Sequence, residues 1–430
     1  MLWRPFTKRI RNVASSHTAV RRTVPSDVLD RRTVSLTDAD VVVVGAGIAG
    51  TTTALLLARA GASVTLLERS AVPDEARAGV LLQPNGLAVL AGLGLDHRLR
   101  AAGCVLHRAA IYGNGSRPIA DSSITDFGHG LDHVLAVRGS ALQEVMLDAV
   151  AGEPAIACRF GAAATRCIPE GAVDLDWRGR SSTIKAELVV GADGVRSAVR
   201  TGGNFGTRVR YAGRSYVRGL VPRNGVLPDG AYWTSLGMFG IAPVDADTVY
   251  FNAAAHMPAV AAAIASGDLN ALTRLWGAAL PLAGCVLSRL GAASDLLHDE
   301  VVRIDCPVWH DGSAVLVGDA AHAMASTVGQ GVNSALVDAV VLVAELAGDG
   351  PQAQALQRYA DRRRCAVGAV QARADMVSRL SGLRSAPVRA ARDLATRVAF
   401  STPGAAARHL RTLQQEDPAT LLATVTALCG

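Results

Sequence analysis

Three closely spaced glycines constrain this chain more than any other feature of its sequence. Gly45, Gly47 and Gly50 come directly after the β-branched run Val41–Val44, and the residues from Gly50 to Ala60 have the composition of a helix. In such a turn the first glycine permits a tight bend, the second lets the backbone approach a pyrophosphate, and the third lets helix and strand pack closely. The free N–H groups at the start of the helix attract the phosphate charge. The segment therefore predicts a strand, a turn and a helix that bind a dinucleotide.

A carboxylate stands where such a site needs one. The next predicted strand, Ser63–Leu67, ends at Glu68, about 20 residues after the glycines, where an acid accepts the hydroxyl groups of a ribose. We assign Ala49, inside the glycine turn, and Arg69, beside Glu68, to the same cofactor-binding set. The alternative is a glycine-rich turn that only packs a helix on a strand. The strand, the helix and the acid together favour the dinucleotide site.

A second glycine-rich block follows the predicted strand Glu187–Val190. It has the sequence Gly-Ala-Asp193-Gly-Val-Arg196-Ser-Ala-Val-Arg200, and we assign Asp193 to cofactor binding. Taken alone, the block is explained equally well as a turn that ends a strand and carries two solvated arginines.

A third block combines an acid, a loop and the start of a helix. Asp319 ends the predicted strand Ala314–Val317, where its carboxylate can accept hydrogen bonds from ribitol hydroxyls. The helix that begins at Gly331, Val332 and Asn333 can direct its N-terminus at the electron-rich pyrimidine edge of an isoalloxazine ring. His322, between the two, is interpreted as a brace for the loop rather than as a general base.

Composition restricts the remaining possibilities. Half of the 430 residues are hydrophobic, so a large core can form, and the net charge of +6 is concentrated near the N-terminus, which argues against a nucleic-acid partner. The seven cysteines are scattered, which predicts reduced thiols in a cytoplasm and no metal site. Apolar stretches such as residues 335–347 end before the roughly 18 residues that a membrane span needs, so no integral membrane segment is expected.

The three blocks, in this order and spacing, resemble the group A flavoprotein monooxygenases, the para-hydroxybenzoate hydroxylase-like aromatic hydroxylases. The segments Arg77-Ala-Gly-Val80 and Leu82-Gln-Pro-Asn85-Gly-Leu resemble the part of that family that runs past the flavin, and the resemblance covers about residues 40–370. It implies FAD as the cofactor. Gly45, Gly47 and Gly50 would lie at its pyrophosphate.

The resemblance also implies roles for single residues. Glu68 would hold the adenosine ribose, Arg77 would neutralise phosphate charge, and Asp319 would hold the ribitol. Asp193 would serve FAD and NAD(P)H indirectly. Since no second G-x-G-x-x-G occurs in the sequence, NAD(P)H is expected as a transient reductant that docks at the surface.

The sequence departs from the family pattern in two places. Ala325 and Ser326 stand where the family has prolines, and because proline fixes φ, a looser loop over the flavin is expected. Gly139 stands where the family has Arg or Gln, with Arg138 one residue early, so Arg138 is our candidate for that cofactor contact.

The expected fold is mixed α/β: a Rossmann-like FAD-binding domain interleaved with a β-sheet substrate domain, followed by a helical C-terminal part. Residues 1–39 are predicted to form a disordered basic extension, either native, targeting or a start-site artefact. The other boundaries are 40–104, 135–202 and 300–350 for the FAD-binding domain, 105–134 and 203–299 for the substrate domain, and 351–430 for the C-terminal helices.

The resemblance implies a function as well. The chain would be an NAD(P)H-consuming monooxygenase that hydroxylates a small organic substrate, aromatic or polyketide-like, with O₂ through a flavin C4a-hydroperoxide. An FAD-dependent epoxidase or reductase, and a non-catalytic FAD-binding protein, are the alternatives. The substrate should lie between the flavin and the second sheet, facing residues such as Tyr211, Arg218, Trp233, Met238 and Phe239. Alternation alone does not decide which of these face inward.

Overall fold

The computed structural model describes residues 39–72, 78–113, 117–225, 228–402 and 404–430. Residues 1–38 of the predicted N-terminal extension lie outside this described part, and so does Arg77, the predicted phosphate contact.

The first sheet carries the three glycine-rich blocks. Its strand order is β17-β18-β11-β1-β2-β8, and the pairs β18/β11, β11/β1, β1/β2 and β2/β8 are parallel. The strands of this sheet and its β9–β10 extension are β1 (Ala39–Val44), β2 (Val64–Glu68), β8 (Ile156–Phe160), β9 (Ala162–Ile168), β10 (Ala172–Trp177), β11 (Arg180–Gly191), β17 (His310–Asp311) and β18 (Ala314–Leu316). Short aliphatic runs such as Val42–Val43 are fully buried, which is why these strands lack polar alternation.

Helices cover this sheet and connect its strands. Helix α1 packs against α10 and α4, and α10 packs against α2, α11 and α14. The helices of the N-terminal two thirds of the chain are α1 (Ile48–Arg59), α2 (Pro84–Gly92), α3 (Asp96–Ala102), α4 (Gly139–Ala151), α5 (Ala198–Gly202), α6 (Pro258–Ala265), α7 (Leu269–Ala279), α8 (Pro281–Leu287) and the 3-10 turn η2 (Ala293–Asp295). The later ones are α9 (Asp319–His322), the 3-10 turn η3 (Ser326–Val328), α10 (Gly331–Ala347), α11 (Gln352–Ser381), α12 (Ala386–Ser401), α13 (Ala405–Leu413) and α14 (Pro418–Leu428).

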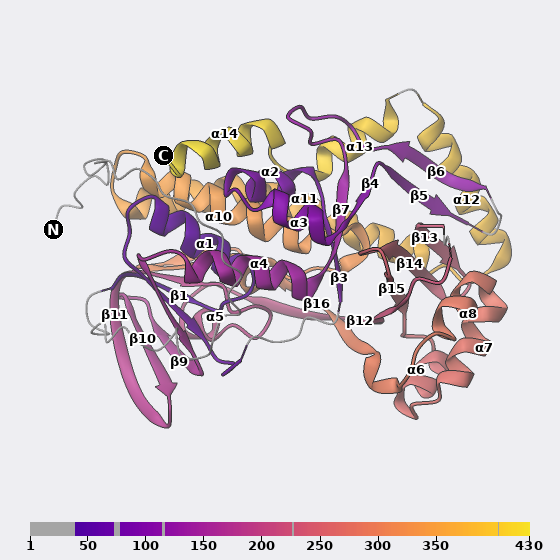
Figure 1. Cartoon of the computed structure of the whole chain (residues 1–430), viewed down its shortest axis with the longest axis horizontal. Coiled ribbons are helices and arrows are strands. Elements are labelled where there is room, and N and C mark those ends of the chain that lie inside the picture. The colour runs from indigo at the N-terminus through magenta and orange to yellow at the C-terminus, as the bar shows by residue number, and fades with distance from the viewer. Residues whose placement is uncertain (1–38, 73–77, 114–116, 226–227, 403) are drawn as a thin grey trace.

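The second sheet has the order β16-β12-β15-β14-β13-β5-β6, and a small sheet β3-β7-β4 stands beside it. Its strands are β5 (Arg108–Tyr112), β6 (Pro118–Ser123), β12 (Arg208–Pro222), β13 (Gly230–Thr234), β14 (Gly237–Pro243), β15 (Thr248–Ala254) and β16 (Leu297–Asp305). The small sheet contains β3 (Gly79–Leu82), β4 (Cys104–Leu106) and β7 (Val134–Arg138). Figure 1 shows the first sheet at the left, the second at the right, and helices α6 to α8 beside the second sheet.

The two faces of the second sheet have different neighbours. Phe239 and Phe251 stack on each other, and Phe239 also contacts Trp276 of α7, so this face packs on α6–α8. Cross-strand partners share a face, and Gly240, Asn252 and Arg218 form one row on the opposite face. That face is directed towards the third glycine-rich block.

The predicted mixed α/β fold is confirmed, including the alternation of segments between two sheets. Strands β4 and β5 are separated at His107, because the chain leaves the small sheet and joins the second one there. The second sheet also runs to Asp305, five residues beyond the substrate-domain boundary placed at 299–300. The remaining domain boundaries stay predictions.

The C-terminal part is helical, as expected from residue 351 onward, and it returns to the first domain. Helix α14 packs on α2, where Gly92 leaves room for Val425. Among the described residues, no helix combines the length and the apolar character needed to cross a bilayer.

A buried charge cluster joins α9, α10 and α11. Asp338 is fully buried, and its carboxylate accepts hydrogen bonds from His322 Nε2, from Arg363 Nε at 2.8 Å and from the backbone N–H of Gly318 at 2.9 Å. Burial alone would raise the pKa of Asp338, but His322 and Arg363 outweigh it and lower the pKa to about 2. The cluster therefore fixes the third block against α10, which agrees with the bracing role predicted for His322.

We expect Asp338→Asn to destabilise the protein by about 3–5 kcal/mol, because the change leaves Arg363 buried without its counter-charge. The exposed pair Arg364–Asp361 supplies a matched control, and Asp361→Asn should cost at most about 1 kcal/mol. Urea unfolding of both variants measures the difference. Equal stabilities for the two variants would contradict the role assigned to the cluster.

The same cluster gives a pH dependence. Since the folded pKa of Asp338 is depressed, its contribution to stability is present above the unfolded pKa of about 3.9 and is lost as pH falls towards 2. Unfolding midpoints measured across this window should converge for wild type and Asp338→Asn. A difference between the two unfolding midpoints that stays constant down to the lowest pH would contradict the stabilising role of the ionised Asp338.

Candidate functional site

The three blocks begin at the carboxyl ends of adjacent strands in register. Val44 is paired with Gly191, and Gly191 with Leu316, so the residues after β1, β11 and β18 emerge side by side. Two contacts bind the blocks together directly. Gly318, with φ of +60°, packs against Ala49 and Ala335, and the buried Arg200 donates to the backbone oxygen of Ala320 at 2.8 Å. Arg200 is thus a structural link between the second and third blocks, not a solvated arginine.

The glycines of the first block are required for different reasons. Gly45 has φ of +101°, and a Cβ there would lie 2.5 Å from the oxygen of Ala192. A Cβ on Gly50 would lie 1.8 Å from the oxygen of Gly45. Gly47 is different, because its φ of −74° suits any residue and a Cβ would have no protein atom within 4 Å. Gly45 and Gly50 serve packing, whereas Gly47 leaves open space in front of the α1 N-terminus.

Glu68 holds the first block in shape. Its carboxylate accepts hydrogen bonds from the N–H groups of Ala46 and Ser70, both at 2.9 Å. Each carboxylate oxygen can accept a second hydrogen bond, so Glu68 can still bind ribose hydroxyls. Arg69 lies exposed beside it. From the other side Gln143 of α4 donates to the oxygen of Ala46 at 2.7 Å. Sequence reasoning missed Gln143.

Asp193 ends the second turn and caps a short helix. Its Oδ2 accepts from the N–H groups of Ala198 and Val199, at 2.7 and 3.2 Å, while Oδ1 is buried without a partner among the described residues. Burial raises the pKa of Asp193, and the hydrogen bonds oppose that shift. Its contacts are with the protein, so an indirect role in cofactor binding stays a prediction.

Asp319 follows β18 and begins the short helix α9. Its side chain is accessible to solvent, yet protein atoms surround it closely enough that desolvation raises its pKa, against the opposing charges of His322 and Arg218. An acceptor at this place can bind the hydroxyl groups of a ribitol chain.

The start of α10 faces the same region. Gly331 has no protein atom within 4 Å of a Cβ, and Val332 is half-buried. The first N–H groups of any helix lack intrahelical partners, so this end carries partial positive charge. Asn333 is fully buried, and its amide donates to the oxygens of Leu81 and Gly329, at 2.9 and 2.7 Å. The Asn333 side chain therefore clamps the loop, and any flavin contact would come from its backbone.

Buried amides support this loop from behind. Gln83 donates to the oxygen of Val328 at 2.8 Å and accepts from Gln330 at 2.7 Å. The oxygen of Gln330 accepts from Asn85 at 3.1 Å and from Gln415 at 2.9 Å. The sequence drew attention to the segment that contains Gln83 and Asn85, but no local pattern links it to Gln330 or Gln415.

One residue of the loop before α10 has a proline-like backbone although it is not a proline, and the looser loop expected from the sequence stays a prediction. Ala325 is buried and has φ of −62°, the value that a proline ring would impose. Ser326 follows as an accessible residue whose hydroxyl lies 3.4 Å from Nδ2 of Asn252 in the second sheet. The second sheet therefore contacts the loop directly.

Arg138 is directed elsewhere than we expected. Its guanidinium forms an ion pair with Asp245 and a hydrogen bond with Thr248, both in the second-sheet domain. It thus ties β7 to the β14–β15 connection, and a cofactor contact for Arg138 stays a prediction that this geometry does not favour.

The residues expected to face the substrate divide into two groups. Tyr211 is 71% exposed on β12, and Phe239 packs on the helices, so neither faces the third block. Trp233 lies on the opposite face under the guanidinium of Arg392. Met238 shares that face, because it is two residues from Gly240.

Arg218 is the expected residue whose charge bears on Asp319. Desolvation raises the pKa of Asp319, and the charge of Arg218, after that of His322, opposes this rise. The Nε of Arg218 donates to Asp299 at 2.8 Å. It also lies beside the hydroxyl of Tyr250, whose pKa burial raises to about 12.

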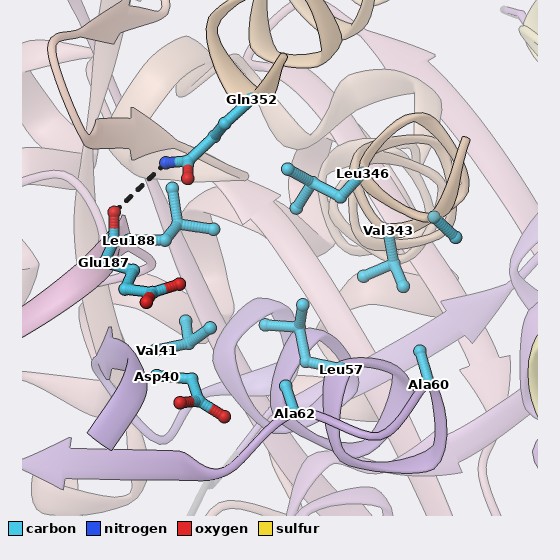
Figure 2. Close-up of a pocket in the computed structure, with 11 residues that line it drawn as sticks. Asp40, Val41, Leu57, Ala60, Ala62, Glu187, Leu188, Val343, Leu346 and Gln352 are labelled. Atoms are coloured by element: carbon cyan, nitrogen blue, oxygen red, sulfur yellow. Dashed lines mark hydrogen bonds between the residues drawn. The ribbon is translucent and has the colours of Figure 1, made fainter. Parts of the chain in front are cut away.

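One small pocket lies at the opposite end of the first sheet. Figure 2 shows it between Val41 of β1, Leu57 of α1, Leu188 of β11 and Leu346 of α10, closed by the hydrogen bond from Gln352 to the oxygen of Glu187. This is the amino end of the parallel strands. Ligands of open α/β sheets bind at the carboxyl ends, so the pocket is not the cofactor site.

The residues at the carboxyl ends of β1, β2 and β18 fit FAD. Open space at Gly47 and Gly331 leaves two helix N-termini accessible to anionic or electron-rich groups. Glu68 and Asp319 supply hydrogen-bond acceptors for the ribose and the ribitol of FAD. Within the described residues, no group of His, Cys, Asp and Glu could hold a metal ion. The fold and this site define a flavoprotein of the doubly wound type.

The comparisons with known proteins agree. Residues 38–222 and 302–374 match the family described as FAD binding domain, and the chain belongs to this family. It is 34% identical over 345 residues to a 3-amino-4-hydroxybenzoate 2-monooxygenase of Streptomyces platensis, covering 75% of this chain and 83% of that protein. It is 29% identical over 325 residues to an aurachin C monooxygenase/isomerase of Stigmatella aurantiaca, covering 74% and 83%. The chain is therefore an FAD-dependent oxidoreductase of the monooxygenase type, as the resemblance implied.

Solved structures share the fold. The tetrameric form of 2-methyl-3-hydroxypyridine-5-carboxylic acid oxygenase is 25% identical, with a TM-score of 0.70 over 88% of this chain and 97% of that one. Klebsiella pneumoniae HpxO, solved with FAD and uric acid, is 24% identical, with a TM-score of 0.74 over 89% and 96%. The second likeness supports the fold alone.

We expect Gly47→Ala to weaken FAD binding at least about tenfold while leaving the apoprotein as stable as wild type, because the new methyl group meets no protein atom but projects in front of α1. Titration of apoprotein with FAD, followed by flavin fluorescence, measures the affinity. Gly368→Ala in α11 is the matched control, since it also meets open space and should leave FAD affinity unchanged. Undiminished affinity in Gly47→Ala would remove the first block from the cofactor site.

Proposed function

We propose that this enzyme uses NAD(P)H and O₂ to hydroxylate a small aromatic substrate. In the balanced reaction, substrate, O₂, NAD(P)H and one proton give hydroxylated substrate, NAD(P)⁺ and water. One oxygen atom forms the new C–O bond and the other leaves as water, with both reducing electrons supplied by NAD(P)H. When bound, FAD supplies the redox chemistry that accepts these electrons and activates O₂.

One observation carries the proposal. The inner face of the second sheet is directed at the third glycine-rich block, where Asn252 contacts Ser326 and Arg218 acts on Asp319. A substrate site between the second sheet and the loop from Ala323 to Gln330, which we call the flavin-side loop, requires such a wall. A flavoprotein that only stored FAD would not need this second sheet against the loop.

The residues of the protein bind and orient the cofactor and keep water away from it. Backbone N–H groups at the start of α1 and α10 attract the pyrophosphate and the ring, and the carboxylates of Glu68 and Asp319 accept from hydroxyl groups. The amides that support the loop, such as the fully buried Gln330, hold these groups in place through hydrogen bonds. No side chain is assigned as a nucleophile, since the cofactor carries the chemistry.

The relatives support an aromatic substrate. Two of their names specify what is oxidised, an aminohydroxybenzoate and aurachin C, and a third is named for its product, 2-heptyl-3-hydroxy-4(1H)-quinolone. We propose a substrate of the same chemical class for this chain. NAD(P)H would reach the flavin transiently, because the sequence contains a single G-x-G-x-x-G. A cytoplasmic site of action is supported by seven free thiols.

We expect FAD-loaded protein to consume NAD(P)H faster with an aromatic substrate than without one and to release a product that has gained one oxygen atom. Incubation under ¹⁸O₂ followed by mass spectrometry should show the label in the product. Substrate-stimulated NAD(P)H oxidation without label would favour the reductase alternative. FAD-loaded protein without any stimulated oxidation across a broad aromatic panel would favour a non-catalytic FAD-binding protein.

A further inference from the structure

Asn252 occupies the middle of the sheet face opposite the flavin-side loop. Its cross-strand neighbours are Gly240 in β14 and Arg218 in β12, so the three residues form one row. Gly240 contributes no side chain, and a Cβ at Gly240 would have only atoms of Asn252 within 4 Å. The wall is therefore open beside the Asn252 side chain.

The amide of Asn252 is only half satisfied. The residue is 6% exposed, and its Nδ2 makes one long hydrogen bond, 3.4 Å, to Oγ of Ser326. Its Oδ1 is buried and has no partner among the described residues. Buried side-chain oxygens in native proteins nearly always have a donor, so this one points to a group that the protein does not supply.

The neighbouring residues do not offer that donor. The guanidinium of Arg218, the next side chain in the row, donates to Asp299 and lies beside the hydroxyl of Tyr250. Ser326 on the other side is accessible and belongs to the loop between Asp319 and α10. The unpaired oxygen therefore lies where the substrate wall meets the flavin-side loop.

We propose that Oδ1 of Asn252 accepts a hydrogen bond from a hydroxyl or ring N–H group of the aromatic substrate and so selects which edge of the ring is presented to the cofactor. The inference rests on the proposed function, since it assumes a substrate against this wall. Asn252 then determines substrate specificity by orienting the ring, and it takes no part in making or breaking bonds.

The test uses FAD-loaded protein and binding alone, so that it does not depend on turnover. The probes are two pairs: para-hydroxybenzoate with para-methoxybenzoate, and 4-quinolone with its N-methyl derivative. Each methylated member lacks the donor hydrogen. Perturbation of the flavin absorbance gives the dissociation constants. Wild type should bind the donor member of at least one pair about 10-fold to 100-fold more tightly, equivalent to about 1.4–2.8 kcal/mol.

Variants of Asn252 distinguish the effect of the lost hydrogen bond from the steric effect of the added methyl group. Asn252→Leu should reduce the affinity ratio within each pair towards one, whereas Asn252→Asp, which keeps an acceptor oxygen, should retain the preference. Asn224→Leu, the same change at an exposed position of the same domain, is the matched control and should keep the wild-type ratio.

Three outcomes overturn the inference: equal binding of both members by wild-type holoprotein, no binding of any probe by that holoprotein, or an undiminished ratio in Asn252→Leu. The wild-type measurement stands even if the leucine variant does not fold. A wild-type protein that fails to take up FAD would instead contradict the proposed function, so the two failures are distinguishable.

Discussion

The close approach of two backbone turns is the constraint on which the rest of this structure depends. Gly45 follows β1 and lies against Ala192, which follows the neighbouring strand β11, at a separation that leaves no room for a Cβ. Since β18 is in register with β11, the turn at Gly318 emerges beside them. Parallel pairing thus brings together three segments that are more than a hundred residues apart, and it places the turns that follow them at one edge of the sheet.

The parts of the fold with local signals could be predicted from the sequence. The glycine turn, the strand that ends at Glu68 and the helix after Gly331 are each encoded within a short window, and the structure contains all three. The side-chain facing of the second sheet could not be predicted, because a strand buried on both faces lacks polar alternation. Phe239 and Met238 are adjacent, and only the position of α7 decides that Phe239 packs on helices.

Long-range polar contacts were beyond sequence reasoning for a different reason. The hydrogen bond between Asn85 and Gln330 joins residues 245 positions apart, and nothing in the composition of either segment specifies the partner. Arg138 illustrates the same limit, because a basic residue near a cofactor domain can pair with any carboxylate that the fold brings close, and here that carboxylate is Asp245. Ala325 shows the converse case, since its backbone adopts the proline-like φ that its side chain does not impose.

The charge cluster at Asp338 joins the two elements that flank the loop without prolines, α9 and α10. A fully buried carboxylate is costly unless its lone pairs are satisfied, and here a histidine, an arginine and the N–H of Gly318 satisfy them. Those partners come from α9, α11 and the end of β18, so displacing α10 would break charged hydrogen bonds to three elements at once. Asp338 lies in the middle of α10, so the cluster fixes this helix, and with it the helix N-terminus at Gly331. The loop from Ala323 to Gln330 connects these two ends, and Ser326 in the loop contacts Asn252 of the second sheet.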